Sequence, residues 1–202
     1  LLAPTMLGAL MDATGADRHK LPRLRQIMYS AAPMPEALLR RGLAAFGPIF
    51  TQVYGLTESG GPGTVFHAHR HKPDGAPNEV RRLRSAGQPM SLTSTRIMRA
   101  DVAFAAPGEI GEVVIRGPAV MSGYWRNDAA TRTTLVDGWL HTGDLGTSDE
   151  EGFIFVVDRL KEMIVSGEEN LYSREVENAV ASCAGVIEAA VVGAPDERWG
   201  EK

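Results

Sequence analysis

The segment from Tyr54 to Gly61 carries the densest set of residues that could do chemistry. Its sequence, Tyr-Gly-Leu-Thr-Glu-Ser-Gly-Gly, gathers an aromatic ring, a hydroxyl and a carboxylate on a glycine-rich turn. Tyr54 could stack on a base, Thr57 could donate to a phosphate oxygen, and Glu58 could bind a hard cation such as Mg²⁺. A loop in which Thr57 and Glu58 cap a helix start would account for the same residues. This segment alone therefore leaves both interpretations open.

Three further glycine-containing blocks follow in the sequence. They are Gly-Glu-Ile-Gly-Glu at 108–112, Gly-Trp-Leu-His-Thr-Gly-Asp-Leu-Gly at 138–146, and Asp-Arg-Leu-Lys-Glu-Met-Ile-Val-Ser-Gly at 158–167. Asp144 in the second block could accept hydrogen bonds from two neighbouring hydroxyl groups through one carboxylate. Taken by itself, it could also be a turn aspartate that caps backbone amides.

In this order, the four blocks closely resemble the adenylate-forming (ANL) superfamily of acyl-CoA synthetases, adenylation domains and firefly-type luciferases. The resemblance extends over residues 4–202. Within it, the sequences of the blocks at 138–146 and 158–162 are most similar to those of the fatty-acid and related acyl-CoA ligases. It implies an AMP-forming ligase that uses ATP, Mg²⁺ and coenzyme A, and the single cysteine, Cys183, fits a cytoplasmic location. A carboxylic acid would attack the α-phosphate of ATP to give an acyl-adenylate and pyrophosphate, and the thiol of coenzyme A would then displace AMP.

Two alternatives to this reaction stay open. An adenylation enzyme could deliver the acyl group to the phosphopantetheine of a carrier protein, and AMP release with free coenzyme A would discriminate between the two acceptors. The chain could also be a non-catalytic nucleotide-binding module, which would bind ATP without turnover.

The resemblance implies roles for residues at the adenine of the nucleotide. It places Tyr54 against the adenine ring, with Gly55 in the same motif, and the side-chain amide of Gln52 at the adenine amine. The other wall of the adenine slot matches a segment of small residues, Ala31, Ala32 and Pro33. Ser30 stands where glycine is frequent in the family, which leaves the shape of this wall open.

At the phosphates and the ribose, the resemblance assigns Thr57 to phosphate contact and Glu58 to Mg²⁺. It assigns Asp144 to the ribose hydroxyls, which Arg159 also reaches. Lys161 falls on the hinge about which the small C-terminal domain rotates between the two half-reactions, although a solvated surface charge is the simpler account of a lone lysine.

Gly167 matches the glycine beside which the pantetheine arm of coenzyme A passes. Glu168 departs from the acyl-CoA ligase pattern, in which a second glycine is common. Its side chain could narrow the path of the coenzyme A thiol or lie in solvent.

The helices and strands expected around these residues indicate an α/β fold. We expect part of a large N-terminal domain, made of an α/β layer (1–84, with the adenine and Mg²⁺ segment) and a small β-barrel-like subdomain (85–158). The start of a smaller α+β C-terminal domain, including the hinge, would follow at 159–202. These boundaries come from two changes in pattern, to short extended runs near residue 85 and to a helix–strand unit after Asp158.

Apolar spacing predicts the individual elements. We expect helices from Pro4 and from Pro35 to Phe46, the second stopped by Gly47-Pro48, and parallel strands at 24–29 and 49–54. Short strands follow at 95–98, 112–116, 138–141 and 153–157. A last helix capped by Ser173, with Cys183 in its apolar stripe, would precede a strand at 186–192.

The segment 67–84 lacks an apolar pattern and reads as a solvated connection. His67, His69 and His71 could share one face of a strand as metal ligands, but no acidic or cysteine partner lies at ligand spacing, so a flexible connector is favoured. Arg81, Arg82 and Arg84 could meet the phosphates of coenzyme A, but a solvated face is again the simpler expectation.

Composition excludes several classes of protein. The 202 residues carry 21 Lys+Arg and 25 Asp+Glu, a formal charge of −4, which argues against a nucleic-acid binder. One cysteine excludes an internal disulfide framework and a multi-cysteine zinc site. No apolar run reaches the roughly 18 residues that a membrane-spanning helix needs. The chain starts at Leu1 without methionine, and we expect a piece of a longer enzyme that is inactive alone, because no phosphate loop and no C-terminal catalytic lysine lie within it.

Overall fold

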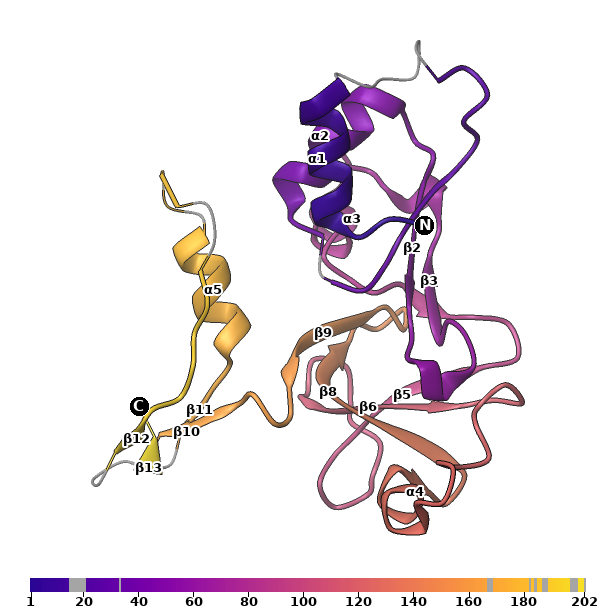
Figure 1. The fold of residues 1–202 in the computed structure, drawn as a ribbon, viewed down its shortest axis with the longest axis vertical. Helices are drawn as coiled ribbons and strands as arrows, with labels where there is room; N and C mark the ends of the chain where they lie inside the picture. Colours follow the sequence, from indigo (N-terminus) through magenta and orange to yellow (C-terminus); the bar gives the residue numbers. More distant parts are fainter. Residues whose placement is uncertain are drawn as a thin grey trace.

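The computed structural model describes residues 1–14, 21–32, 34–166, 169–181, 183, 185–186, 189–196 and 200–201. Figure 1 shows three parts that follow one another along the chain. An α/β part with helices α1 to α3 precedes a part built on an antiparallel sheet, and a smaller part with α5 stands to one side. This mixed α/β architecture confirms the predicted fold class.

The α/β part has a four-stranded sheet in the order β1 (Ile27–Tyr29), β2 (Phe50–Tyr54), β3 (Thr64–Phe66), β4 (Gln88–Pro89). The predicted parallel pairing of β1 with β2 is confirmed, but β3 and β4 run antiparallel to their neighbours. The chain returns from β2 to β3 through a short turn that contains the 3₁₀ helix η1 (Thr57–Ser59), which is too short for the crossover that a parallel strand needs.

Helices α1 (Pro4–Thr14) and α2 (Glu36–Phe46) form as predicted and supply one side of the core. Their apolar residues recur at helical spacing and pack against the strands. The side chains of this core that are 0–1% exposed are Leu7, Tyr29, Leu39, Phe46, Phe50, Phe66 and, from the second part, Phe153. Strands β1 and β2 are therefore anchored in an apolar interior through Tyr29 and Phe50.

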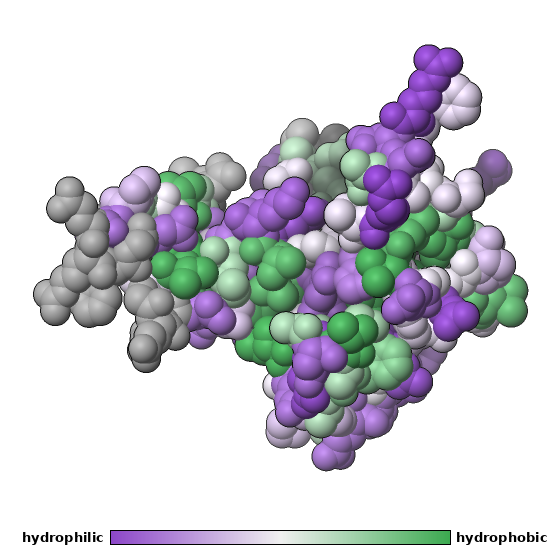
Figure 2. Space-filling view, turned by 90° about the horizontal axis from the view of Figure 1, so that it is seen from below, coloured by the Kyte–Doolittle hydropathy of each residue, from purple (hydrophilic) through white to green (hydrophobic). Residues whose placement is uncertain are grey.

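The second part is a five-stranded antiparallel sheet, as the short extended runs predicted. β5 (Ser94–Met98), β6 (Gly111–Arg116), β8 (Trp139–Ser148) and β7 (Leu135–Val136) lie in this order, and β9 (Ile154–Arg159) pairs with β8. Helix α4 (Asp128–Thr134) precedes β7. Figure 2 shows apolar patches separated by polar groups on the underside of the molecule, and the strongly exposed apolar side chains of this part include Leu92, Val102, Phe104 and Trp125.

The strand predicted at 138–141 is longer than expected because it continues through a bulge. Glu112 pairs with Leu145 and Val114 with His141, so residues 142–144 of β8 all face Val113 of β6. Gly143 has φ +72°, a conformation that side chains disfavour, and it allows the strand to bend and continue. The bulge sets the direction of Asp144.

The third part combines β10 (Ile164–Ser166), β11 (Glu169–Leu171), β12 (Pro195–Asp196) and β13 (Gly200–Glu201) with α5 (Ser173–Ala181). α5 begins at Ser173 as predicted, but the Ser173 hydroxyl donates to Asp158 at 3.0–3.1 Å. Cys183 is exposed beyond the end of α5, so the prediction that it packs in the helix was wrong. Of the strand predicted at 186–192, the described residues are not in a strand, and 187–188 lie outside the described residues.

The interpretation of 67–84 as a solvated connection was also wrong. This segment forms the 3₁₀ helix η2 (Ala68–Arg70) and α3 (Pro77–Arg82), and it buries His71 and Arg82. Arg82 bonds Asp149 at 2.8 Å, so the expected solvated arginine face does not hold at this residue. No helix in the described ranges is long and apolar enough to cross a membrane.

Candidate functional site

Tyr54, Asp144 and Arg159 come together where β2 meets the hairpin of β8 and β9. The Tyr54 hydroxyl donates to Asp144 Oδ2 at 2.6 Å, and Arg159 Nε lies 2.7 Å from Asp144 Oδ1. Asp144 is 4% exposed and pairs across the two strands with Arg159. Three predicted site residues from separate strands thus form one hydrogen-bonded cluster.

A second carboxylate holds the bulge that carries Asp144. Glu112 of β6 accepts from the Gly143 amide at 2.8 Å and contacts His141 Nδ1 at 2.6 Å. The Thr142 hydroxyl donates to the Val113 carbonyl at 2.6 Å and accepts from the Asp144 amide at 3.1 Å. These contacts fix the backbone on both sides of Asp144, so its carboxylate has little freedom to turn away.

The electrostatics of the cluster keep Tyr54 as a donor. Burial raises the pKa of the Tyr54 phenol well above its ordinary value of 10, and the negative charge of Asp144 raises it further. The phenol therefore stays protonated at neutral pH and donates to Asp144. An ionised carboxylate has about four lone-pair sites, so Asp144 can accept further hydrogen bonds beyond those from Tyr54 and Arg159.

The glycine-rich turn after β2 folds back tightly on itself. A Cβ on Gly55 would lie 2.5 Å from the Gly61 carbonyl oxygen, so this position requires a residue without a side chain. Thr57 and Glu58 lie in η1, where Thr57 is exposed and Glu58 is half-buried. The Glu58 carboxylate accepts from the Tyr124 hydroxyl at 2.7 Å.

The small-residue segment and Gln52 lie at the same sheet edge as Tyr54. Tyr29 pairs with Gln52 in the parallel register, so the loop that starts after β1 lies beside the end of β2. Ala31 and Ala32 are exposed, and Ala31 adopts φ +74°, which is uncommon for a residue with a side chain. Pro33 lies outside the described residues.

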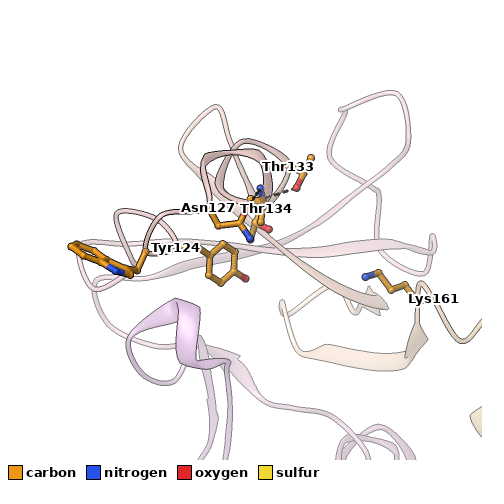
Figure 3. A pocket seen from close by; sticks show the side chains of 7 residues that line it. Tyr124, Asn127, Thr133, Thr134 and Lys161 are labelled. Carbon is orange, nitrogen blue, oxygen red and sulfur yellow. Dashed lines mark hydrogen bonds between the residues drawn. The ribbon is translucent and has the colours of Figure 1, made fainter.

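Lys161 lies apart from this cluster, in the turn after β9. It lines an open cleft of about 530 Å³ together with Tyr124, Trp125 and residues of α4. Figure 3 shows Tyr124 beneath α4 and Lys161 across the cleft on a separate segment. The predicted site residues in the described ranges are thus distributed over the cluster at Asp144, the ends of β1 and β2 with η1, and the turn at Lys161. Gly167 and Glu168 lie outside the described residues.

The three histidines of 67–71 do not form a metal site in the described part of the chain. The rings of His67 and His69 stack at 5.7 Å, whereas His71 is buried and its Nε2 accepts from the Tyr29 hydroxyl at 3.0 Å. No group of three or more histidine, cysteine, aspartate or glutamate side chains could hold a metal ion among the described residues.

Sequence reasoning gave no role to Glu112 and Tyr124. Glu112 lies in the block 108–112, which carried the resemblance but received no assigned function. Tyr124 follows Gly123 in a loop before α4, and its partner Glu58 lies 66 positions earlier. A glycine-aromatic pair directly before a capped helix is the one local signal that could have identified it.

Two family models match the chain. The model described as AMP-binding enzyme matches residues 1–125, and the model described as AMP-binding enzyme C-terminal domain matches residues 175–202. The first match includes β1, β2 and the whole turn from Tyr54 to Gly61.

Curated proteins and solved structures are also similar to this chain. A fatty acid–[acyl-carrier-protein] ligase, ScoC, of Streptomyces coeruleorubidus is 40% identical over 99% of the chain and 38% of its own length. A medium/long-chain-fatty-acid–CoA ligase, FadD8, of Mycobacterium tuberculosis is 38% identical over 100% of the chain and 34% of its own length. The structure of O-succinylbenzoate coenzyme A synthetase from Bacillus subtilis, in complex with ATP and magnesium ion, matches with a TM-score of 0.82 and 33% identity, over 99% of the chain and 39% of that structure. The chain thus spans little more than a third of the length of these relatives.

Proposed function

The chain belongs to the AMP-binding enzyme family. Because of this membership, we propose that the protein activates a carboxylic acid with ATP. The carboxylate oxygen attacks the α-phosphorus, the bond to pyrophosphate breaks, and an acyl-adenylate forms. The thiol of coenzyme A then attacks the acyl carbon, loses its proton, and releases AMP with the electron pair of the broken bond. We further propose a fatty acid as substrate and a cytoplasmic location, where ATP and coenzyme A are available.

The cluster of Tyr54, Asp144 and Arg159 carries this proposal. Asp144 retains acceptor capacity for the ribose hydroxyls, and Arg159 adds a fixed donor next to it. The Tyr54 ring, held at its hydroxyl, offers one face to the adenine. Ala31 and Ala32, at the same sheet edge, would form the opposite wall of the adenine slot, to which we also assign Pro33. The side-chain amide of Gln52 would meet the adenine amine.

Thr57 and Glu58 fit the phosphates and their metal. Mg²⁺ prefers oxygen ligands and is commonly bound by one or two carboxylates together with substrate phosphates. Glu58 offers one such carboxylate: Tyr124 occupies Oε1, and no hydrogen bond of a described residue reaches Oε2. When bound, Mg²⁺ would neutralise charge on the phosphates during the displacement. Thr57 supplies an exposed hydroxyl on the same turn.

Lys161 and Gly167 belong to the second half-reaction in this proposal. Lys161 is exposed in the turn that links β9 to β10, where a change in backbone torsion would move the third part of the molecule. Gly167 would leave room for the pantetheine arm of coenzyme A. We infer that the rotation about Lys161 exchanges the two catalytic arrangements.

A carrier protein is the second candidate acceptor. The relative ScoC is named as a ligase that uses acyl-carrier-protein, so the acyl group could pass to a protein-bound phosphopantetheine in place of coenzyme A. The two acceptors share the same reactive thiol, and they differ in the partner that delivers it.

Pyrophosphate exchange and AMP release test the proposal with the protein as its gene encodes it. Exchange should depend on a carboxylic acid, and AMP release should rise when coenzyme A is added. Asp144→Ala should weaken ATP binding about 10–100-fold, because a lost charged hydrogen-bond partner costs about 1.5–3 kcal/mol, with acid binding unchanged. Nucleotide binding without exchange would support the non-catalytic alternative, and AMP release only with acyl-carrier protein would replace coenzyme A as acceptor.

A further inference from the structure

Glu58 is held from outside its own turn by the loop between β6 and α4. The Tyr124 hydroxyl donates to Glu58 Oε1 at 2.7 Å, and the Met121 amide donates to the Glu58 carbonyl at 2.8 Å. The loop therefore fixes both the backbone and the side chain of Glu58. Neither contact is needed for η1 itself, which is closed by its own backbone hydrogen bonds and by Ser59.

Tyr124 is in turn anchored to α4. Its backbone amide donates to the Thr131 hydroxyl at 2.9 Å, and that hydroxyl donates to the Asn127 carbonyl at 2.9 Å. Asn127 caps α4 by accepting from the Ala130 amide at 3.1 Å. The backbone of Tyr124 is therefore tied to the start of α4, and its ring lines the cleft (Figure 3). Its hydroxyl lies on Glu58.

We propose that Tyr124 is a positioning residue that orients the Glu58 carboxylate for Mg²⁺. With Oε1 bound to the phenol, the side chain is restricted to orientations in which Oε2 is free to bind a cation. Partners of this kind orient metal ligands, and their loss commonly costs about 10–100-fold in metal affinity or activity. The inference rests on the proposed role of Glu58 as the metal ligand.

Binding of Mn²⁺ as a paramagnetic probe tests this inference without relying on turnover. Free Mn²⁺ is measured by electron paramagnetic resonance in the presence of α,β-methylene-ATP and the protein as its gene encodes it. Tyr124→Phe removes only the hydroxyl, and we expect it to weaken Mn²⁺ binding about 10-fold. The affinity for the ATP analogue in EDTA, and the thermal midpoint, should stay within experimental error of the unsubstituted protein.

Trp125→Phe is the matched control. Trp125 is the next residue and is 86% exposed, and no hydrogen bond joins it to Glu58 within the described ranges. The Trp125→Phe substitution should leave Mn²⁺ binding unchanged. Thr131→Val keeps the phenol but loosens its anchor, so it should weaken Mn²⁺ binding by a smaller factor of about 2–5. This variant supplies an independent test where Tyr124→Phe lowers the folded fraction.

Glu58→Gln separates failure of the inference from failure of the proposed function. If Glu58→Gln leaves Mn²⁺ binding unchanged, Glu58 is not the metal ligand, and the role of Tyr124 is overturned with it. If Glu58→Gln weakens Mn²⁺ binding but Tyr124→Phe and Thr131→Val do not, the metal assignment stands and the positioning role is wrong. An equal loss of ATP-analogue affinity in EDTA for Tyr124→Phe would place the phenol on the nucleotide and also overturn the proposal.

Discussion

The α/β part and the hairpin of β8 and β9 are stabilised in different ways. The core of the α/β part consists mainly of apolar and aromatic side chains, although this part also buries His71 and Arg82. The hairpin instead buries three carboxylates, Asp144, Asp149 and Asp158. Each of these carboxylates bonds a different element outside the hairpin: Tyr54 at the end of β2, Arg82 in α3, and Ser173 at the start of α5. Apolar packing holds one part together, and buried carboxylates fix how the parts meet.

This difference has an energetic reason. Burying apolar surface is favourable and tolerates many arrangements, whereas a buried charge is acceptable only when its partner lies at the correct place. A buried ion pair adds little net stability but strongly disfavours arrangements that separate the partners. We therefore expect substitutions in the two regions to lower the free energy of unfolding by different amounts.

The largest effect should come from the apolar core. Phe50→Ala removes a fully buried ring that contacts Tyr29 and Phe46 at 6.4 Å between ring centroids. We expect the free energy of unfolding to fall by about 3–5 kcal/mol, measured by denaturant titration. Leu92→Ala, at an 85% exposed apolar residue of the second part, should change it by less than about 0.5 kcal/mol. Equal losses in the two variants would contradict the assignment of Phe50 to the core.

The next effect should come from the contact between α3 and the hairpin tip. Asp149 accepts from Arg82 Nε at 2.8 Å and from the Glu151 and Phe153 amides at 3.0 Å. Asp149→Ala removes this partner, so that Arg82 keeps Glu151 at 2.8 Å from Nη2, and it leaves the two amides without their acceptor. We therefore expect a loss of about 2–3 kcal/mol in unfolding free energy. The exposed neighbour Glu150→Ala should cost less than about 0.5 kcal/mol.

A double substitution sharpens this prediction. Arg82→Met removes the charge while keeping a long apolar side chain against Phe153, whose ring lies 4.3 Å from the guanidinium carbon of Arg82. Combined with Asp149→Ala, it should recover part of the lost stability. If the double variant is as unstable as the sum of the single variants, the two residues do not act as a pair.

A pH dependence of stability should arise from His71, which is buried in the α/β part beside Tyr29. Burial lowers the pKa of His71 to about 4 from its ordinary value of 6.5. The unfolded chain therefore binds more protons between these values, so stability is complete above pH 6.5 and falls as the pH drops towards 4. The difference corresponds to at most about 3 kcal/mol, at 1.36 kcal/mol per pKa unit. Unfolding free energies measured from pH 7 to pH 4 give this slope.

His71→Phe is the control for the pH dependence. It keeps an aromatic ring beside Phe66 and Tyr29 but has no group that titrates in this range. The exposed His69 adds only a weaker charge effect, which lowers the pKa of His71 slightly further. The slope between pH 6.5 and pH 4 should become clearly smaller in His71→Phe, and an unchanged slope would assign the pH dependence to other groups.

The same contrast explains which features were predictable from the sequence. Helices α1 and α2 and strands β1, β2, β5 and β6 lie within a few residues of their predicted bounds, because their apolar spacing is local information. The prediction for the segment 67–84 was wrong because two of its three buried residues, His71 and Arg82, are polar and give no apolar pattern. His71 and Arg82 are satisfied by Tyr29 and Asp149, which lie 42 and 67 positions away.

The candidate site shows the same limit. The motifs placed Tyr54 and Asp144 in one functional group, but nothing local indicated that the phenol would donate to the carboxylate 90 positions later. Glu112 and Tyr124 act through similarly distant partners, so their contributions became visible only from the arrangement of the strands. Residues that support a site from a distance are therefore the hardest to find from a single sequence.

The smallest expected change in stability concerns Ala31, which follows β1 of the α/β part and has a strained backbone. Its φ of +74° costs a residue with a Cβ roughly 1–2 kcal/mol, which glycine avoids. Glycine also gains freedom in the unfolded chain, worth about 0.4–1 kcal/mol in the opposite direction. Ala31→Gly should therefore raise the free energy of unfolding by about 0.5 kcal/mol, measured by denaturant titration.

The neighbouring Ala32 provides the matched comparison, because it is also exposed and is not among the described residues with positive φ. Ala32→Gly relieves no strain and only frees the unfolded chain, so it should lower stability by about 0.4–1 kcal/mol. The two substitutions should thus have opposite signs. If strain at Ala31 presents the adenine wall proposed above, Ala31→Gly should also weaken ATP binding by a factor of about 2–5 while it stabilises the fold. Changes of the same sign in the free energy of unfolding for both variants would show that Ala31 stores no strain. Tighter ATP binding by Ala31→Gly would show that the strained conformation does not serve the adenine wall.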